Sequence, residues 1–202
     1  MKVQTGLSLA AAVALCAGVA AGAINPIDPF TGDYFEGFET QGGGQFLPYY
    51  DVFDGTAVLR SVDGSATMHI TGGWYYYYYI GPHGGSYFFG SAGPACEYVF
   101  DVPAMMFGGY FGTNYQTADG TADFYDEDGN LLASLDVGAP LGAWKWNGWE
   151  ETTGVGIKSV VLTGAHPQGG WLMQDDMQYT PIPGPGALAL IAMAGLVKRR
   201  RR

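Results

Sequence analysis

The sequence predicts an all-β fold, an antiparallel β-sandwich of the jelly-roll kind, and three observations support it. Short runs of β-branched and aromatic residues are cut by Gly, Pro, Asn and Asp at intervals of about ten residues, a spacing typical of sandwiches and barrels. Between the two ends of the chain, no segment keeps a helical period. The chain has 33 Gly together with 14 Tyr, 11 Phe and 5 Trp, which indicates many tight turns around an aromatic core.

Each expected strand is a run of this kind between two turn signals. In chain order the strands are expected at Tyr34–Phe38, Thr56–Val62, Ala66–Ile70, Trp74–Ile80, Ser86–Phe89, Glu97–Val102, Met105–Phe111, Thr121–Tyr125, Leu131–Val137, Ala143–Trp146, Ile157–Thr163 and Trp171–Tyr179. The segment from Asp126 to Asn130 contains Asp-Gly and predicts a hairpin turn. It is not an EF-hand, because Leu131 stands where that loop needs Gly and Val137 where it needs Glu.

The amino-terminal segment predicts a secretory signal peptide over residues 1–23. Lys2 gives a positive start, and Leu7–Cys16 is an apolar stretch too short for a membrane span. Ala21-Gly22-Ala23 gives the small-x-small pattern that signal peptidase cleaves, so we expect Ala21 and Ala23 to mark the cleavage site. Leu15 precedes Cys16 where a lipoprotein signal has a small residue, so no lipid is expected. The predicted body is one β-sandwich domain over residues 24–180.

The carboxyl-terminal segment, residues 181–202, has three parts in a fixed order. Pro181–Pro185 contains three prolines and cannot continue a strand or a helix. The uncharged run Gly186–Val197 follows; as a short hydrophobic helix it would be roughly 18 Å long, less than a hydrocarbon core of about 30 Å. The chain then closes on Lys198–Arg202, which would stay on the cytoplasmic side. A simple tail anchor is the alternative, although a permanent anchor is usually longer.

These three parts resemble the PEP-CTERM sorting signal, with Pro183-Gly184-Pro185 where the family has Pro-Glu-Pro, and with Arg199 and Arg200 in the basic ending. The resemblance covers residues 182–202. It implies that the host is a Gram-negative-type bacterium that makes extracellular polysaccharide. It also implies that the tail enters the inner membrane transiently and is read by an exosortase, leaving the protein at the cell surface or outside the cell.

The charge of the body excludes one class of partner. All nineteen acidic residues lie between Asp28 and Asp176, and only Arg60, Lys145 and Lys158 are basic between the two signals. The body therefore carries a formal charge of −16 from three basic and nineteen acidic residues. Such a body repels nucleic acid and anionic lipid, so nucleic-acid binding is not expected. Removal of Cys16 would leave Cys96 alone, without a disulfide partner.

The run Trp74–Tyr79, WYYYYY, is the main candidate for ligand binding. In a strand, Trp74, Tyr76 and Tyr78 would share one face, and aromatic rings with a polar edge stack on sugar rings. Trp144, Trp146 and Trp149 are further candidates for the same surface. The alternative is that one face of this strand fills the core and the other is a half-buried surface.

Four carboxylates form the second candidate site. Glu36 and Glu39 lie in or after the first expected strand, and Asp175 and Asp176 in the last, and these two strands are often neighbours in jelly rolls. Oxygen ligands of this kind suit a structural Ca²⁺, although adjacent aspartates on a strand point to opposite faces. The pattern from Gly170-Trp171 to Tyr179 resembles the closing strands of exported carbohydrate-binding-like sandwiches. An exposed acidic strand is the alternative.

Catalytic motifs are missing from the sequence. It contains no Gly-x-Ser-x-Gly, no paired-His zinc spacing among His69, His83 and His166, and no phosphate-binding loop. We therefore expect a non-enzymatic protein that associates with extracellular polysaccharide through aromatic residues. The alternatives are a self-associating structural envelope protein and, with less support, a glycan-degrading enzyme that uses two of the carboxylates.

Overall fold

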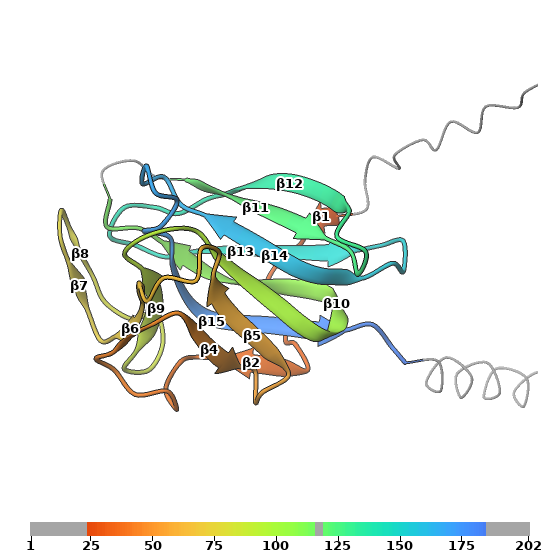
Figure 1. Ribbon diagram of the computed structural model, residues 1–202, viewed down its shortest axis with the longest axis horizontal. Helices are drawn as coiled ribbons and strands as arrows, with labels where there is room; N and C mark the ends of the chain where they lie inside the picture. The colour runs from red at the N-terminus through yellow and green to blue at the C-terminus, as the bar shows by residue number, and fades with distance from the viewer. Residues whose placement is uncertain (1–23, 116–118, 185–202) are drawn as a thin grey trace, which may run out of the picture.

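A computed structural model describes residues 24–115 and 119–184, and this part of the chain is an antiparallel β-sandwich (Figure 1). The predicted fold class is therefore confirmed. The predicted signal peptide, with Ala21 and Ala23, lies outside the described residues, as do Pro185, Arg199 and Arg200. Within the described ranges, no helix has the length and apolar character needed to cross a membrane.

Two layers of strands pack face to face. One layer has the order β12 (Leu131–Val137), β11 (Gly120–Tyr125), β14 (Ile157–Thr163), the first half of β10 (Cys96–Gly112), β5 (Ala57–Ser61) and β4 (Tyr49–Val52). The other has β1 (Ile24–Pro26), β13 (Lys145–Glu151), the second half of β10, and β15 (Met173–Pro181). Beyond β15 lie β2 (Tyr34–Glu36) and, through β9 (Phe88–Ser91), β6 (Met68–Thr71) and β3 (Phe46–Leu47).

Strand β10 belongs to both layers. Its residues Cys96–Phe100 pair with β5, and its residues from Ala104 to Gly112 pair with β15. The sequence predicted two separate strands here, with a break at Pro103. The chain instead stays extended through Pro103 and passes from one layer to the other, with an irregular register between Val99 and Ala104. A proline, which has no N–H to donate, is tolerated at such an irregularity.

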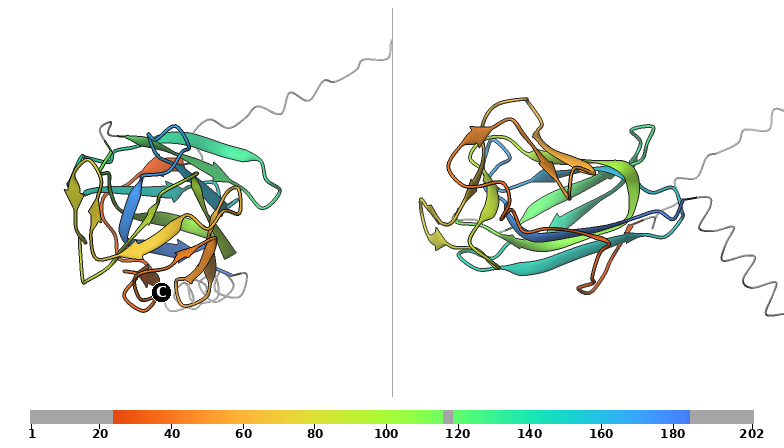
Figure 2. Two further views of the ribbon diagram at one scale, coloured as in Figure 1. Left: turned by 60° about the vertical axis from the view of Figure 1, so that its left-hand side comes forward. Right: turned by 90° about the horizontal axis from the view of Figure 1, so that it is seen from below.

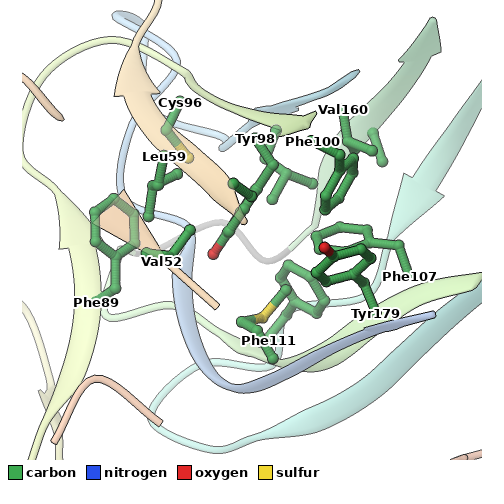
Figure 3. Packing of buried hydrophobic residues seen from close by; sticks show 14 of the residues in the cluster. Val52, Leu59, Phe89, Cys96, Tyr98, Phe100, Phe107, Phe111, Val160 and Tyr179 are labelled. Atoms are coloured by element: carbon green, nitrogen blue, oxygen red, sulfur yellow. The ribbon is translucent and has the colours of Figure 1, made fainter. Parts of the chain in front are cut away.

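The core between the layers is mainly aromatic (Figure 3). Tyr98, Phe100, Phe107 and Tyr179 are at most 1% exposed and pack ring against ring at centroid distances of 4.8–5.5 Å along this group. Cys96 is buried in the same core cluster, and burial raises the pKa of its thiol to about 12, so it is not a reactive nucleophile. Other rings and aliphatic side chains complete the cluster.

Two sequence-based expectations about the strands need correction. Trp149, predicted to extend the aromatic surface, is 2% exposed and packs in the core against Phe107 and Phe111. The segment Trp74–Ile80 is not one strand but a hairpin of β7 (Trp74–Tyr75) and β8 (Tyr79–Ile80). The expected pairing of the first and last predicted strands is confirmed by β2 and β15, with Glu36 opposite Met177. Strands β1, β3 and β4 were not predicted.

The β7–β8 hairpin lies at one end of the molecule. It stands out from the two layers on the left of Figure 1, while β15 ends on the opposite side, where the chain leaves the body. The view from below in Figure 2 shows the same separation along the longest axis. The aromatic run is thus presented at the end of the molecule opposite to the one where β15 ends.

Candidate functional site

Five consecutive tyrosines of the hairpin are exposed to solvent. The exposed fractions are 76% for Tyr75, 66% for Tyr76, 50% for Tyr77, 55% for Tyr78 and 52% for Tyr79. The predicted alternation of two faces is wrong, because the chain reverses at Tyr76–Tyr78. Only the two short strands at the base of the hairpin pair with each other; we call β7 the first foot and β8 the second foot. None of these five rings is buried in the core.

Glycines at the feet of the hairpin give the Tyr79 ring its place. A Cβ atom on Gly81 would lie 2.8 Å from the Tyr79 hydroxyl oxygen, and one on Gly73 would lie 3.0 Å from its Cε2 atom. Tyr79 can therefore lie across both feet, and Tyr75 packs on it with a centroid distance of 4.5 Å. The hydroxyl of Thr71 donates to the carbonyl of Gly73 at 3.0 Å and further fixes the first foot.

Rings from two other loops support the hairpin. Trp171 contacts Tyr76 at a centroid distance of 4.6 Å, and Tyr115 contacts Tyr77 at 5.4 Å. His166 stacks on Trp171 at 5.4 Å. Among the described residues, Tyr78 is the hairpin tyrosine whose ring packs against no other ring. We call the whole set the aromatic platform; its members are Trp74, Tyr75, Tyr76, Tyr77, Tyr78, Tyr79, Tyr115, His166 and Trp171.

Trp74, itself a platform residue, and Trp144 connect the hairpin to the body of the sandwich. Trp74 is half-buried and packs against a small core of Ile80, Phe88 and Met173. The Trp144 indole packs on the same core and donates its Nε1–H to the carbonyl of Gly81 at 2.9 Å. Both tryptophans were predicted as ligand-binding residues, and the structure places them where they hold the second foot of the hairpin.

Trp146, the fifth predicted ligand-binding residue, lies away from the hairpin. Its Nε1–H donates to the carbonyl of Ile27 at 3.1 Å, and its ring contacts Tyr110 at 5.5 Å. It lines a surface depression of about 390 Å³ together with Asp136 and Lys145. The predicted residues are therefore divided between the hairpin and a separate part of the surface.

Three of the four predicted carboxylates hold one loop, residues 83–87, which follows the hairpin. Asp175 accepts the backbone N–H groups of His83 at 2.7 Å and of Gly84 at 3.1 Å. Asp176 lies 2.6 Å from Nδ1 of His83. Glu39 accepts the N–H groups of Ser86 at 2.7 Å and of Tyr87 at 2.9 Å. Together they fix the chain directly after the second foot.

The two adjacent aspartates reach the same loop because the strand is irregular at this point. Asp176 has a φ of 47°, in the left-handed region, and the register of β10 and β15 shifts between Gly108 and Tyr110. Such a bulge cancels the alternation that would send Asp175 and Asp176 to opposite faces. Asp175 is completely buried, and burial, followed by the charge of Asp176, raises its pKa to about 7.

Glu36 serves a separate turn. It is 7% exposed and accepts the N–H groups of Phe38 at 2.7 Å and of Phe53 at 3.1 Å, and burial raises its pKa. Among residues 24–115 and 119–184, no three His, Cys, Asp or Glu side chains lie close enough together to hold a metal ion. The predicted calcium therefore stays a prediction, and the contacts that the structure gives these carboxylates are to the protein's own N–H groups and to His83.

The predicted sorting motif begins where the body ends. The Ile182 N–H donates to the carbonyl of Pro103 at 2.9 Å, which ties the chain to the bend of β10. Pro183 and Gly184, the next two residues, are exposed. This part of the motif is therefore accessible on the surface of the body.

Comparisons with known proteins give fold likeness alone. The chain is similar to the K2 cleaved adhesin domain of Lys-gingipain, with 14% identity over 73% of this chain and 98% of that one, and a TM-score of 0.49. It is also similar to TmCBM61, solved with β-1,4-galactotriose, with 16% identity, coverages of 72% and 94%, and a TM-score of 0.44. The CBM22-1 xylan-binding domain of Paenibacillus barcinonensis Xyn10C is similar with 13% identity, over 78% of this chain and 99% of that one, and a TM-score of 0.44.

No family model matches the chain, and no curated protein matches it at a significant level. The three TM-scores lie below 0.5, so the fold assignment stands on the strand pairing described above, and any function has to come from the geometry of the site.

Proposed function

We propose that this protein is an exported, non-enzymatic module that associates with extracellular polysaccharide through its aromatic platform. The single observation that carries the proposal is the hairpin of five tyrosines, each at least 50% exposed, at one end of the sandwich (Figure 1). A contiguous exposed apolar patch on a soluble domain usually marks an interaction site.

The chemistry of the hairpin suits a sugar chain. The C–H groups of a pyranose ring pack on an aromatic face, and the phenol hydroxyl at the edge of each ring can donate to or accept from sugar hydroxyls. Trp171 contacts Tyr76 and Tyr115 contacts Tyr77, so these two rings are oriented before a ligand arrives. Rings held in advance lose less conformational entropy on binding.

The proposal includes the route out of the cell. Signal peptidase would release the chain after Ala23, and an exosortase would read the tail that starts at Pro183-Gly184-Pro185. Mass spectrometry of the native protein tests this part. We expect a chain that starts at Ile24 and lacks Lys198–Arg202; a native protein that keeps both ends would contradict it.

A pull-down on the host's extracellular polysaccharide tests the binding itself. We expect retention of the mature chain, and release of the chain by soluble sugar. Retention that no sugar competes away, or no retention at all, would contradict the proposal.

Self-association is the second candidate, because the same exposed rings could pack against another copy of the chain. Light scattering separates the two functions. Self-association predicts a particle size that grows with protein concentration and does not respond to sugar, whereas glycan binding predicts a constant size and a response to sugar.

A further inference from the structure

We infer that the aromatic platform selects uncharged polysaccharides and discriminates against those that carry carboxylate or sulfate groups. This inference rests on the proposed function and adds the chemical class of the ligand. It depends on where the few cationic side chains of the body lie, and on where its carboxylates lie.

None of the three basic side chains of the body belongs to the aromatic platform. Arg60 forms an ion pair with Glu97 at 2.7 Å, and Nζ of Lys158 donates to the carbonyl of Asp101 at 3.0 Å. The Lys145 side chain lies over Gly138, where a Cβ atom would stand 2.6 Å from its Nζ atom. In the described ranges, therefore, the platform contains no Lys or Arg that could pair with an anionic sugar.

The histidines near the platform do not supply a free positive charge either. Nδ1 of His166 accepts the N–H of Gln168 at 3.2 Å, so this nitrogen is engaged within its own turn. Burial lowers the pKa of His69, which packs beside Trp74, so this ring is neutral at pH 7. His83 is turned toward the carboxylate of Asp176, at 2.6 Å.

Negative charge is concentrated behind the hairpin. Glu39 and Asp176 contact loop 83–87, which follows the second foot directly, and Asp175, whose pKa is about 7, is partly ionised on the same loop at neutral pH. The body as a whole has nineteen acidic residues against three basic ones between the two predicted signals. A field of this sign slows the approach of an anionic polymer, and an unpaired carboxylate pressed onto aromatic rings would lose hydration without gaining a partner.

The rings themselves impose no such penalty on a neutral sugar. Tyr75, Tyr76, Tyr77, Tyr78 and Tyr79 offer ring faces for C–H groups and phenol hydroxyls for hydrogen bonds. These contacts involve no net charge, so binding should respond little to ionic strength. A neutral hexose or pentose polymer is therefore the class of ligand that the platform fits.

The test measures binding of the full mature chain to neutral polymers (a glucan, a galactan and a xylan) and to anionic ones (polygalacturonate and alginate), at low and high salt. At low salt we expect at least one neutral polymer to bind ten or more times as tightly as either anionic one. The affinity for neutral polymers should not depend on salt. The difference in affinity between neutral and anionic polymers should become smaller at high salt, because salt screens the repulsion.

A matched pair of variants tests the cause. Gln168→Lys places one positive charge beside His166 and keeps every ring. We expect it to reduce the difference in affinity between neutral and anionic polymers. Glu127→Gln makes the same change in net charge on the exposed β11–β12 turn, and should leave this difference unchanged.

Anionic polymers that bind the wild type as tightly as neutral ones at low salt would overturn the inference while the proposed function stood. Equal changes in this affinity difference for Gln168→Lys and Glu127→Gln would also overturn the inference. If no polymer of either class binds, the proposed function fails and the inference fails with it.

Discussion

Tyr78 differs from the other hairpin tyrosines because no other described ring packs on it. Its side chain is 55% exposed and is available to a ligand. We expect Tyr78→Ala to weaken binding to the cognate polysaccharide by roughly fivefold, equivalent to about 1 kcal/mol of aromatic stacking. The free energy of unfolding should not change, since the ring supports nothing. Isothermal titration and denaturant unfolding measure the two quantities.

The control for Tyr78 is Tyr49→Ala. Tyr49 is 58% exposed on β4 and is not part of the platform, so its loss should not affect affinity. Equal losses of affinity in the two variants would show that the hairpin has no special role.

Trp74 is expected to behave in the opposite way. It is half-buried against Ile80, Phe88 and Met173, so Trp74→Ala should lower the free energy of unfolding by about 2 kcal/mol, less than the 3–5 kcal/mol of a fully buried ring. Thermal melting of the variant and the wild type measures this loss of stability. An unchanged melting temperature combined with lost affinity would restore Trp74 to the direct binding role that the sequence suggested.

Asp175 should make stability depend on pH. Its pKa is raised from 3.8 to about 7, so the folded protein binds a proton more tightly than the unfolded chain does. The stability contributed in this way is fully present below pH 3.8 and is lost as the pH rises to about 7. As the pH rises across this range, the wild type should lose unfolding free energy relative to Asp175→Asn, by up to about 1.4 kcal/mol per pH unit. Parallel stability profiles for the two proteins would show that Asp175 titrates normally.

At the scale of elements, loop 83–87 is held mainly by carboxylates. Glu39→Ala removes the acceptor for the Ser86 and Tyr87 N–H groups, each bond being worth about 1 kcal/mol. We expect faster hydrogen exchange at these two amides, with exchange in β10 unchanged. Glu127→Ala, on an exposed turn, is the control. Unchanged exchange at Ser86 and Tyr87 would mean that the loop does not need Glu39.

The regular strands could be predicted from the sequence, and the irregular ones could not. Leu131–Val137 and Ile157–Thr163 have the predicted bounds, because each is an apolar run between strong turn signals. Strand β3 has two residues and β4 has four, with Pro48 between them, so each is too short to be recognised from its periodicity. Trp74–Ile80 has the composition of a strand, and only the glycines at its feet indicate that it folds back on itself.

The site was predictable only in part, for a related reason. Exposed tyrosines were found from composition, but Tyr115, His166 and Trp171 join them only through the topology of the sandwich. Glu39, Asp175 and Asp176 all contact one loop, as the neighbouring first and last strands suggested, but they do not form a metal-binding cluster within the described ranges. Their shared target, the backbone of loop 83–87, carries no signal in the side chains of the sequence. The φ of 47° at Asp176, which aims both aspartates at that loop, is equally invisible there.

For the molecule as a whole, the calcium prediction can be tested by melting. A bound ion at a hundred times its Kd would stabilise the fold by about 2.7 kcal/mol. Because the four carboxylates already accept protein N–H groups or contact His83, we expect the same melting temperature in Ca²⁺ and in chelator. A higher melting temperature in Ca²⁺ would show that an ion binds and that the carboxylates rearrange to hold it.

The position of the hairpin relative to β15 also has a mechanical consequence. A ligand pulling on the hairpin while the chain is held by its carboxyl end would stretch the molecule along its longest axis, along which β15 also runs (Figure 1). The hydrogen bonds that join β15 to β10, from Met173 to Pro181, would then be loaded side by side, in shear. Bonds loaded together resist a pull better than bonds that open one after another, so the sandwich is oriented to bear tension between its two ends.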